Sequence, residues 1–191
     1  MNYILYWFVK IFLSPLFYLL FQPKIKNYKN IPKNVPVVLA GNHKSNFDCA
    51  TVVASTTRVV HFLAKAELLN TPFKLFFKGM GIIPVHRKRK DKDALESAIN
   101  ILKENKVIGI FPEGTTNKTN DLLLPFKFGA VKMASVTNAY IVPFSITGNY
   151  KPFGNITITF GEAYKVSSDL EKENEILKNK VSELLKGSKN E

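Results

Sequence analysis

The residues best suited to catalysis lie in the segment NHKSNFD, residues 42–48, which follows an apolar run. His43 and Asp48 are five residues apart, and in a regular helix this spacing would place their side chains about 140° apart. Contact between them therefore requires a loop or the start of a helix. Ser45 and Asn46 are favourable N-cap residues and predict a helix that begins just before Asp48.

In that geometry Asp48 can hold one ring nitrogen of His43 while the other stays free to accept a proton. Such a pair is typical of general base catalysis. The segment alone leaves a second interpretation open, in which His43 is a structural loop residue and Asp48 merely starts a helix. Two further motifs favour the catalytic interpretation.

The second motif is GMGIIPVHR, residues 79–87: a glycine-rich turn, a short apolar run and Arg87 at its end. A residue at the carboxyl end of a strand lies on the side of an α/β sheet where ligands bind. A guanidinium there can bind a phosphate group through two hydrogen bonds. We therefore predict that Arg87 contacts substrate, and we interpret the basic residues 88–90 as a solvated loop.

The third motif is FPEGTT, residues 111–116, at the end of another apolar run. Gly114 lets the backbone approach a ligand closely. Thr115 and Thr116 add hydroxyl groups, and the amides of such a turn can bind an anion. Two interpretations of Glu113 stay open: a buried carboxylate that organises the turn, or a direct substrate contact.

The remaining pattern predicts elements that position these motifs. Short apolar runs predict strands at Val35–Ala40, Val59–Leu63, Ile82–Val85, Val107–Phe111, Tyr140–Ser145 and Ile156–Phe160. Amphipathic stretches predict helices at Phe73–Lys78, Asp91–Asn105, Ala130–Thr137 and Asp169–Leu185. Their alternation predicts an α/β domain with a mostly parallel or mixed sheet of about six or seven strands. Several runs are continuously apolar, which is typical of strands covered on both faces.

The segment Tyr3–Phe21 is almost entirely apolar or aromatic and long enough, as a helix, to approach the thickness of a bilayer core. Lys10 and Pro15 oppose a simple span. We expect a bent anchor lying in one leaflet, with a tilted span or a buried helix of a soluble domain as alternatives. We therefore divide the chain into an anchor, residues 1–23, and a domain, residues 24–191.

Composition narrows the functional classes. The 191 residues contain 27 Lys and Arg against 15 Asp and Glu, a net charge of +12. Such a charge suits nucleic acid, an anionic membrane or acidic partners. No base-reading motif accompanies it, so we expect no nucleic-acid partner. The single cysteine, Cys49, excludes an internal disulfide and a cysteine-built metal site, and it indicates a reducing compartment.

The motifs NHKSNFD, GIIPVHR and FPEGTT, together with IVPFSI at residues 141–146, resemble the four ordered blocks of the glycerolipid acyltransferase superfamily. The chain is most similar to bacterial 1-acylglycerol-3-phosphate acyltransferases, over roughly residues 31–160. The resemblance implies that His43 and Asp48 are the catalytic pair. It also implies that Arg87 and Lys65 bind the phosphate of the acceptor.

Further binding residues follow from the same blocks. We expect Asn42 and Ser45 beside the histidine, and Glu113, Gly114, Thr115 and Thr116 in the third block, to contact substrate. The third block of the family usually ends in Thr-Arg, whereas this chain has Thr116 at the arginine position. Lys118 is one candidate to replace that cation.

The implied function is transfer of a fatty acyl group from acyl-acyl carrier protein or acyl-CoA to a lysophospholipid hydroxyl. The expected product is phosphatidic acid, formed without a metal or further cofactor, at the cytoplasmic face of the inner membrane. Alternatives are another lysolipid or alcohol acceptor, and a lipid or thioester hydrolase in which the His–Asp pair activates water. A basic nucleic-acid-binding module is the least favoured.

Overall fold

A mixed sheet forms the centre of the protein. The structure is a computed structural model that describes residues 1–86 and 91–188. Within these residues the strand order is β1-β7-β6-β2-β5-β3-β4, and β8 also pairs with β6. The pairs β6–β7 and β6–β8 are antiparallel, and the other pairs are parallel. The strands span Lys24–Lys26 (β1), Val37–Gly41 (β2), Val60–Lys65 (β3), Ile83–Val85 (β4), Val107–Ile110 (β5), Tyr140–Thr147 (β6), Thr157–Phe160 (β7) and Tyr164–Lys165 (β8).

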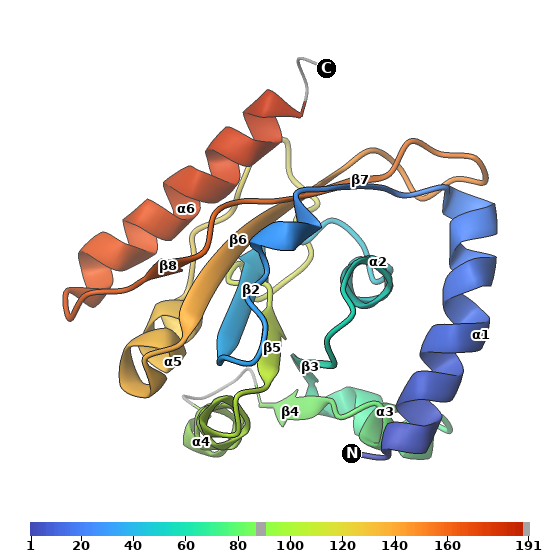
Figure 1. Ribbon diagram of the computed structural model, residues 1–191, viewed down its shortest axis with the longest axis horizontal. Coiled ribbons are helices and arrows are strands. Elements are labelled where there is room, and N and C mark those ends of the chain that lie inside the picture. Colours follow the sequence, from blue (N-terminus) through green and yellow to red (C-terminus); the bar gives the residue numbers. More distant parts are fainter. Residues whose placement is uncertain (87–90, 189–191) are drawn as a thin grey trace.

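Helices cover both faces of this sheet (Figure 1). The α-helices span Tyr3–Phe21 (α1), Asp48–Ser55 (α2), Lys74–Gly79 (α3), Lys92–Lys103 (α4), Gly129–Thr137 (α5) and Leu170–Gly187 (α6). Two 3-10 turns span Tyr28–Asn30 (η1) and Ala66–Asn70 (η2). Helices α4, α5 and α6 lie on one face, and α2 lies on the other, with α1 packed against it. The predicted α/β class with an apolar N-terminal helix is confirmed.

Strand β2 shows why the central runs are apolar throughout. Val38 and Ala40 pack into the core shared with α4, α5 and α6, whereas Val37 and Leu39 pack into the core beside α2. All four residues are fully buried. Burial of each large aliphatic side chain stabilises the fold by about 1.5–3 kcal/mol, so both faces of the strand favour apolar residues.

The six predicted strands and four predicted helices are present, with ends within two residues of those expected. The sequence pattern missed β1 and β8. These strands are only three and two residues long, and both contain lysine. They belong to the sheet only because a neighbouring strand offers backbone partners, which no periodicity in their own sequence reveals.

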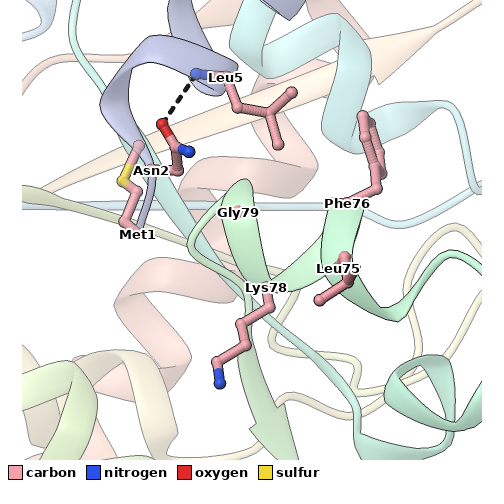
Figure 2. Close-up of a pocket in the computed structure, with 7 residues that line it drawn as sticks. All are labelled: Met1, Asn2, Leu5, Leu75, Phe76, Lys78 and Gly79. Atoms are coloured by element: carbon pink, nitrogen blue, oxygen red, sulfur yellow. Dashed lines mark hydrogen bonds between the residues drawn. The ribbon is translucent and has the colours of Figure 1, made fainter.

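Helix α1 is uninterrupted across Pro15 and is fixed to the domain at its first turn. Asn2 Oδ1 accepts a hydrogen bond from the Leu5 amide, and the Asn2 amide donates to the Gly79 carbonyl of α3. A cleft of about 620 Å³ lies between this turn and α3. Figure 2 shows the residues that line it. A Cβ at Gly79 would lie 2.4 Å from the terminal methyl group of Leu5, so a larger residue here would displace that side chain.

Most apolar side chains of α1 nevertheless face outward. Ile4 is 84% exposed, and only Tyr6 and Phe17 are buried in this helix. The Tyr6 hydroxyl accepts a hydrogen bond from the Val60 amide of β3. This exposure is contrary to the alternative of a buried soluble-type helix. The division between residues 1–23 and 24–191 stays a prediction, because α1 packs against both α2 and α3.

Candidate active site

Three parallel strands end at one edge of the sheet, and each leads to a predicted site residue. Strand β5 lies between β2 and β3, and Ala40 pairs with Ile110, so β2 and β5 end side by side. His43 follows β2, Glu113 follows β5 and Lys65 ends β3. The carboxyl edge of parallel strands is where α/β proteins build their sites. The topology therefore gathers motifs that are far apart in the chain.

His43 contacts Asp48 through its ring nitrogen Nδ1, which lies 2.8 Å from Oδ2. An ionised carboxylate only accepts hydrogen bonds, so Nδ1 carries the proton and Nε2 keeps a lone pair. Asp48 is fully buried, whereas 14% of the His43 side chain is exposed. The Phe111 ring stacks on the imidazole, with 4.2 Å between ring centroids. The pair can thus present one basic nitrogen in a fixed orientation.

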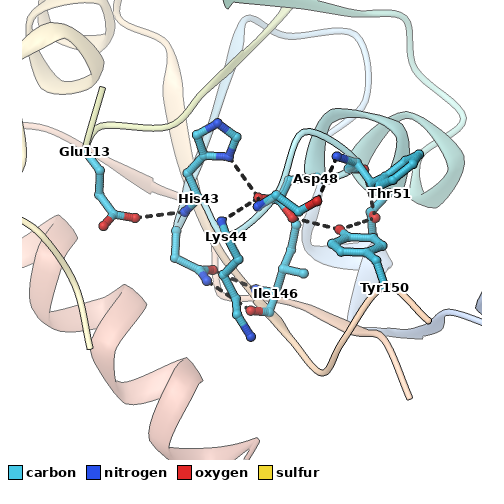
Figure 3. Close-up of polar contacts among 10 residues, drawn as sticks. His43, Lys44, Asp48, Thr51, Glu113, Ile146 and Tyr150 are labelled. Atoms are coloured by element: carbon cyan, nitrogen blue, oxygen red, sulfur yellow. Dashed lines mark hydrogen bonds and ion pairs between the residues drawn. The ribbon is translucent and has the colours of Figure 1, made fainter. Parts of the chain in front are cut away.

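Several donors hold the Asp48 carboxylate (Figure 3). The amides of Lys44 and Ser45 donate to Oδ2 at 2.6 and 2.8 Å. The Tyr150 hydroxyl donates to Oδ1 at 2.7 Å. These donors fix both carboxylate oxygens, so Asp48 is oriented to stabilise a protonated imidazole next to it.

The prediction that Ser45 or Asn46 caps the following helix is wrong. Phe47 occupies the N-cap position of α2 and makes no side-chain cap bond. The Ser45 hydroxyl instead accepts a hydrogen bond from the Phe47 amide at 3.2 Å. The turn is organised around Asp48, which takes the amides of residues 44 and 45 itself.

Two predicted substrate contacts bond to the backbone. Glu113 Oε1 accepts from the His43 amide and Oε2 from the Leu124 amide, both at 2.8 Å. Burial raises the pKa of this carboxyl group. The Asn42 amide group pairs with the Ile146 backbone, donating at 3.0 Å and accepting at 2.7 Å. This geometry favours the turn-organising interpretation of Glu113 and gives Asn42 a similar structural position.

The turn after β5 collects several polar groups. Gly114 has φ +69°, and its amide donates to the Phe111 carbonyl. The ammonium of Lys127 lies 2.7 Å from the place a Cβ on Gly114 would occupy. The amides of Thr115 and Thr116 donate to no protein acceptor within the described part of the chain. The turn therefore brings together a cation, two hydroxyls and two available amides.

These groups line one cavity of about 1390 Å³. Its polar part includes His43, Lys65 and the turn residues 114–116, and its walls are mainly apolar side chains from α1, α2, α3 and β3. Large, mostly apolar cavities with a few convergent polar groups are typical of small-molecule sites. This cavity is large enough for a hydrocarbon chain together with a polar headgroup.

The structure does not place the remaining predicted residues in the wall of this cavity. Ser45 does not line the cavity. Arg87 lies outside the described residues. Lys118 is exposed and does not line the cavity, so Lys127 is the better placed candidate for the cation missing at Thr116.

Sequence reasoning missed Lys127, Tyr150 and Thr51. Lys127 follows the third motif by eleven residues, and a lysine in a loop of a chain this basic carries no distinguishing signal. Tyr150 reaches Asp48 from 102 residues away. Thr51 lies on α2 and contacts Tyr150. The fold alone brings Lys127 and Tyr150 to the site, whereas Thr51 lies three residues after Asp48 on α2 and is joined to it through Tyr150.

A family model described as "Acyltransferase" matches residues 22–147, which include His43, Asp48 and the FPEGTT turn. The chain belongs to the acyltransferase family. A 1-acyl-sn-glycerol-3-phosphate acyltransferase from Borreliella burgdorferi is 37% identical over 127 residues, covering 64% of this chain and 50% of the relative. The Bacillus subtilis protein of the same name is 32% identical over 127 residues, covering 65% of this chain and 62% of the relative. The chain therefore spans about half to three fifths of these family members.

A solved structure supports the fold of this family member. The crystal structure of the 1-acyl-sn-glycerophosphate (LPA) acyltransferase PlsC from Thermotoga maritima aligns with a TM-score of 0.75 at 23% identity. The alignment covers 88% of this chain and 73% of the other. The α/β arrangement of this chain is therefore that of a solved acyltransferase.

Proposed function

We propose that this protein transfers a fatty acyl group from an acyl thioester to the hydroxyl group of a lysophospholipid. The acceptor we favour is 1-acylglycerol-3-phosphate, giving phosphatidic acid, because several relatives carry that acceptor in their names. The observation that carries the proposal is the carboxylate-held imidazole of His43 in the wall of a large apolar cavity.

In the proposed reaction Nε2 of His43 takes the proton of the acceptor hydroxyl as its oxygen attacks the thioester carbonyl. The carbon–sulfur bond then breaks, and the imidazolium returns the proton to the leaving thiolate. Asp48 stabilises the charged ring between these two steps. A positioned general base contributes typically about 10²–10⁴-fold to the rate.

The proposal assigns two further roles, one to backbone amides of the turn after β5 and one to three basic residues. The amides of Thr115 and Thr116 receive the negative charge that develops on the carbonyl oxygen, where one donor contributes about 3–4 kcal/mol. Lys127, Lys65 and Arg87 bind the phosphate of the acceptor. The thioester, from acyl carrier protein or coenzyme A, is the cosubstrate, and the chemistry requires no metal.

The proposed location is an anionic membrane surface. Helix α1 is 19 residues long with a mean hydropathy of 1.9, and 6% of its most apolar window is buried within the protein. It lies along the domain and supplies part of the cavity wall. We propose that α1 lies in the cytoplasmic leaflet of the inner membrane, so that lipid substrates enter the cavity directly. Sedimentation with anionic vesicles in low and high salt tests this placement.

An acyl-transfer assay tests the proposed reaction. Purified protein is incubated with vesicles containing one of several lysolipids, crossed with acyl-acyl carrier protein or acyl-CoA, and the lipid products are identified by mass spectrometry. Diacyl product that depends on the lysolipid is the expected result. Release of free fatty acid at the same rate with and without acceptor would instead identify a thioester hydrolase.

A further inference from the structure

Tyr150 belongs to none of the sequence motifs, yet its hydroxyl donates to the catalytic carboxylate. The contact is 2.7 Å long and ends on Asp48 Oδ1, the oxygen that faces away from His43 (Figure 3). Burial and the neighbouring Asp48 charge raise the pKa of Tyr150 far above its ordinary value. The hydroxyl therefore keeps its proton and remains a donor at any physiological pH.

Thr51 extends this contact into a chain of hydrogen bonds. Its hydroxyl lies 2.7 Å from the Tyr150 oxygen. The Thr51 hydroxyl also lies 3.2 Å from the Phe47 carbonyl. Because the single proton of Tyr150 goes to Asp48, the shorter contact between Thr51 and Tyr150 requires Thr51 to be its donor. The order is then Thr51 to Tyr150 to Asp48, with His43 on the other oxygen. Each donor in such a chain polarises the next one.

Aromatic packing fixes the Tyr150 ring from the side on which α1 lies. Phe21, the last residue of α1, meets the ring edge-on at 5.7 Å between centroids. Phe47, directly before α2, lies 5.5 Å from both rings. The three rings join the end of α1 to the loop that carries His43. The Tyr150 hydroxyl thus has little freedom to leave Asp48.

We propose that Tyr150 is a positioning residue that orients Asp48 toward His43 and connects this orientation to the end of the apolar helix. The kinetic part of the proposal rests on the acyltransferase function proposed above. The hydrogen-bond part does not, because it concerns the resting protein.

The test is the full-length Tyr150→Phe variant, which keeps the ring and its aromatic contacts. We expect kcat to fall about tenfold, because the Asp48 carboxylate loses the bond that holds it in line with the imidazole, with KM values within about twofold of the original protein. The acid limb of the pH–rate profile should move to higher pH, because a carboxylate with fewer donors attracts the imidazole proton more strongly. Glu113, Cys49 and Lys44 are titratable residues beside His43, Asp48 or Tyr150, and they are unchanged in this variant.

Tyr18→Phe is the matched control. Like Tyr150→Phe, this substitution removes a single tyrosine hydroxyl. The Tyr18 hydroxyl donates to the Ala54 carbonyl at 3.2 Å and so joins α1 to α2, but it does not contact Asp48. Thr51→Val should change kcat and the acid limb in the same direction as Tyr150→Phe, by a smaller amount. Tyr18→Phe should leave both unchanged.

Nuclear magnetic resonance titration of the His43 ring provides a readout without substrate. We expect its midpoint to move to higher pH in Tyr150→Phe and not in Tyr18→Phe. A variant that loses stability but whose folded fraction keeps the original kcat, pH profile and ring titration would overturn the proposal. A moved ring titration in a protein without transferase activity would support the positioning role and refute the proposed function.

Discussion

The loops that follow β2 and β5 meet at His43 but hold it in different ways. In the β2 loop, Asp48 bonds to the ring itself, at Nδ1. In the β5 loop, Glu113 bonds to the His43 amide, and the Asn117 amide donates to the His43 carbonyl at 2.8 Å. Both carboxylates are buried, but one holds the side chain and the other holds the backbone.

This difference assigns a catalytic role to Asp48 and a structural role to Glu113, although both are buried carboxylates at the same site. A carboxylate in contact with the imidazole changes charge stabilisation during proton transfer. A carboxylate bonded only to amides stabilises the turn in every state of the reaction and so contributes mainly to folding. Burial or a raised pKa alone would not distinguish the two residues, whereas the atom that each contacts does.

The largest expected effect is in the β2 loop. His43→Ala should lower kcat by about 10²–10⁴-fold, because it removes the proposed general base. Asp48 keeps the amides of Lys44 and Ser45 and the Tyr150 hydroxyl as partners, so circular dichroism and chemical unfolding should show a folded protein. Turnover close to that of the original protein would refute the assignment of the base.

A paired substitution sharpens the comparison between the two carboxylates. Asp48→Asn should lower kcat by at least about tenfold, since the amide no longer stabilises the imidazolium. Glu113→Gln should lower the free energy of unfolding by about 1–3 kcal/mol, because one backbone amide loses its acceptor, with a much smaller effect on kcat per folded molecule. Equal kcat losses in the two variants would remove the distinction.

The sequence predicted more of the first loop than of the second. The contact between His43 and Asp48 depends on a spacing of five residues, so the local pattern allowed it to be proposed, although the cap predicted at Ser45 or Asn46 was wrong. The contacts of Glu113 with His43 and Leu124 depend on how β2 and β5 pair, and the sequence therefore left two interpretations of this residue open. The central strands were predicted for a similar reason, since their apolar runs lie within one segment each.

In the proposed function, binding of the acceptor depends on Lys127 in the loop after β5. The expected change in the KM for the acceptor is intermediate in size. Lys127→Ala should raise the KM for a phosphate-bearing lysolipid several-fold, up to about tenfold, with little change in the KM for the acyl donor. Lys118→Ala is the matched control, because this lysine is exposed and lies outside the cavity. A rise confined to the donor KM would instead place the phosphate of the donor beside Lys127.

The smallest expected effect is the pH dependence of stability that Glu113 introduces. Burial raises its pKa in the folded protein above the ordinary value of 4.5. Between these two pKa values the folded state binds more protons than the unfolded chain, so the stabilisation present below the unfolded pKa is lost as the pH rises through the folded pKa. Glutamine does not titrate, so the difference in unfolding free energy between the original protein and Glu113→Gln should decrease as the pH rises above 4.5. Urea unfolding at several pH values measures this difference. A constant difference would mean that the two amides fully compensate the burial of the carboxylate, and the contrast with Asp48 would then rest on kcat alone.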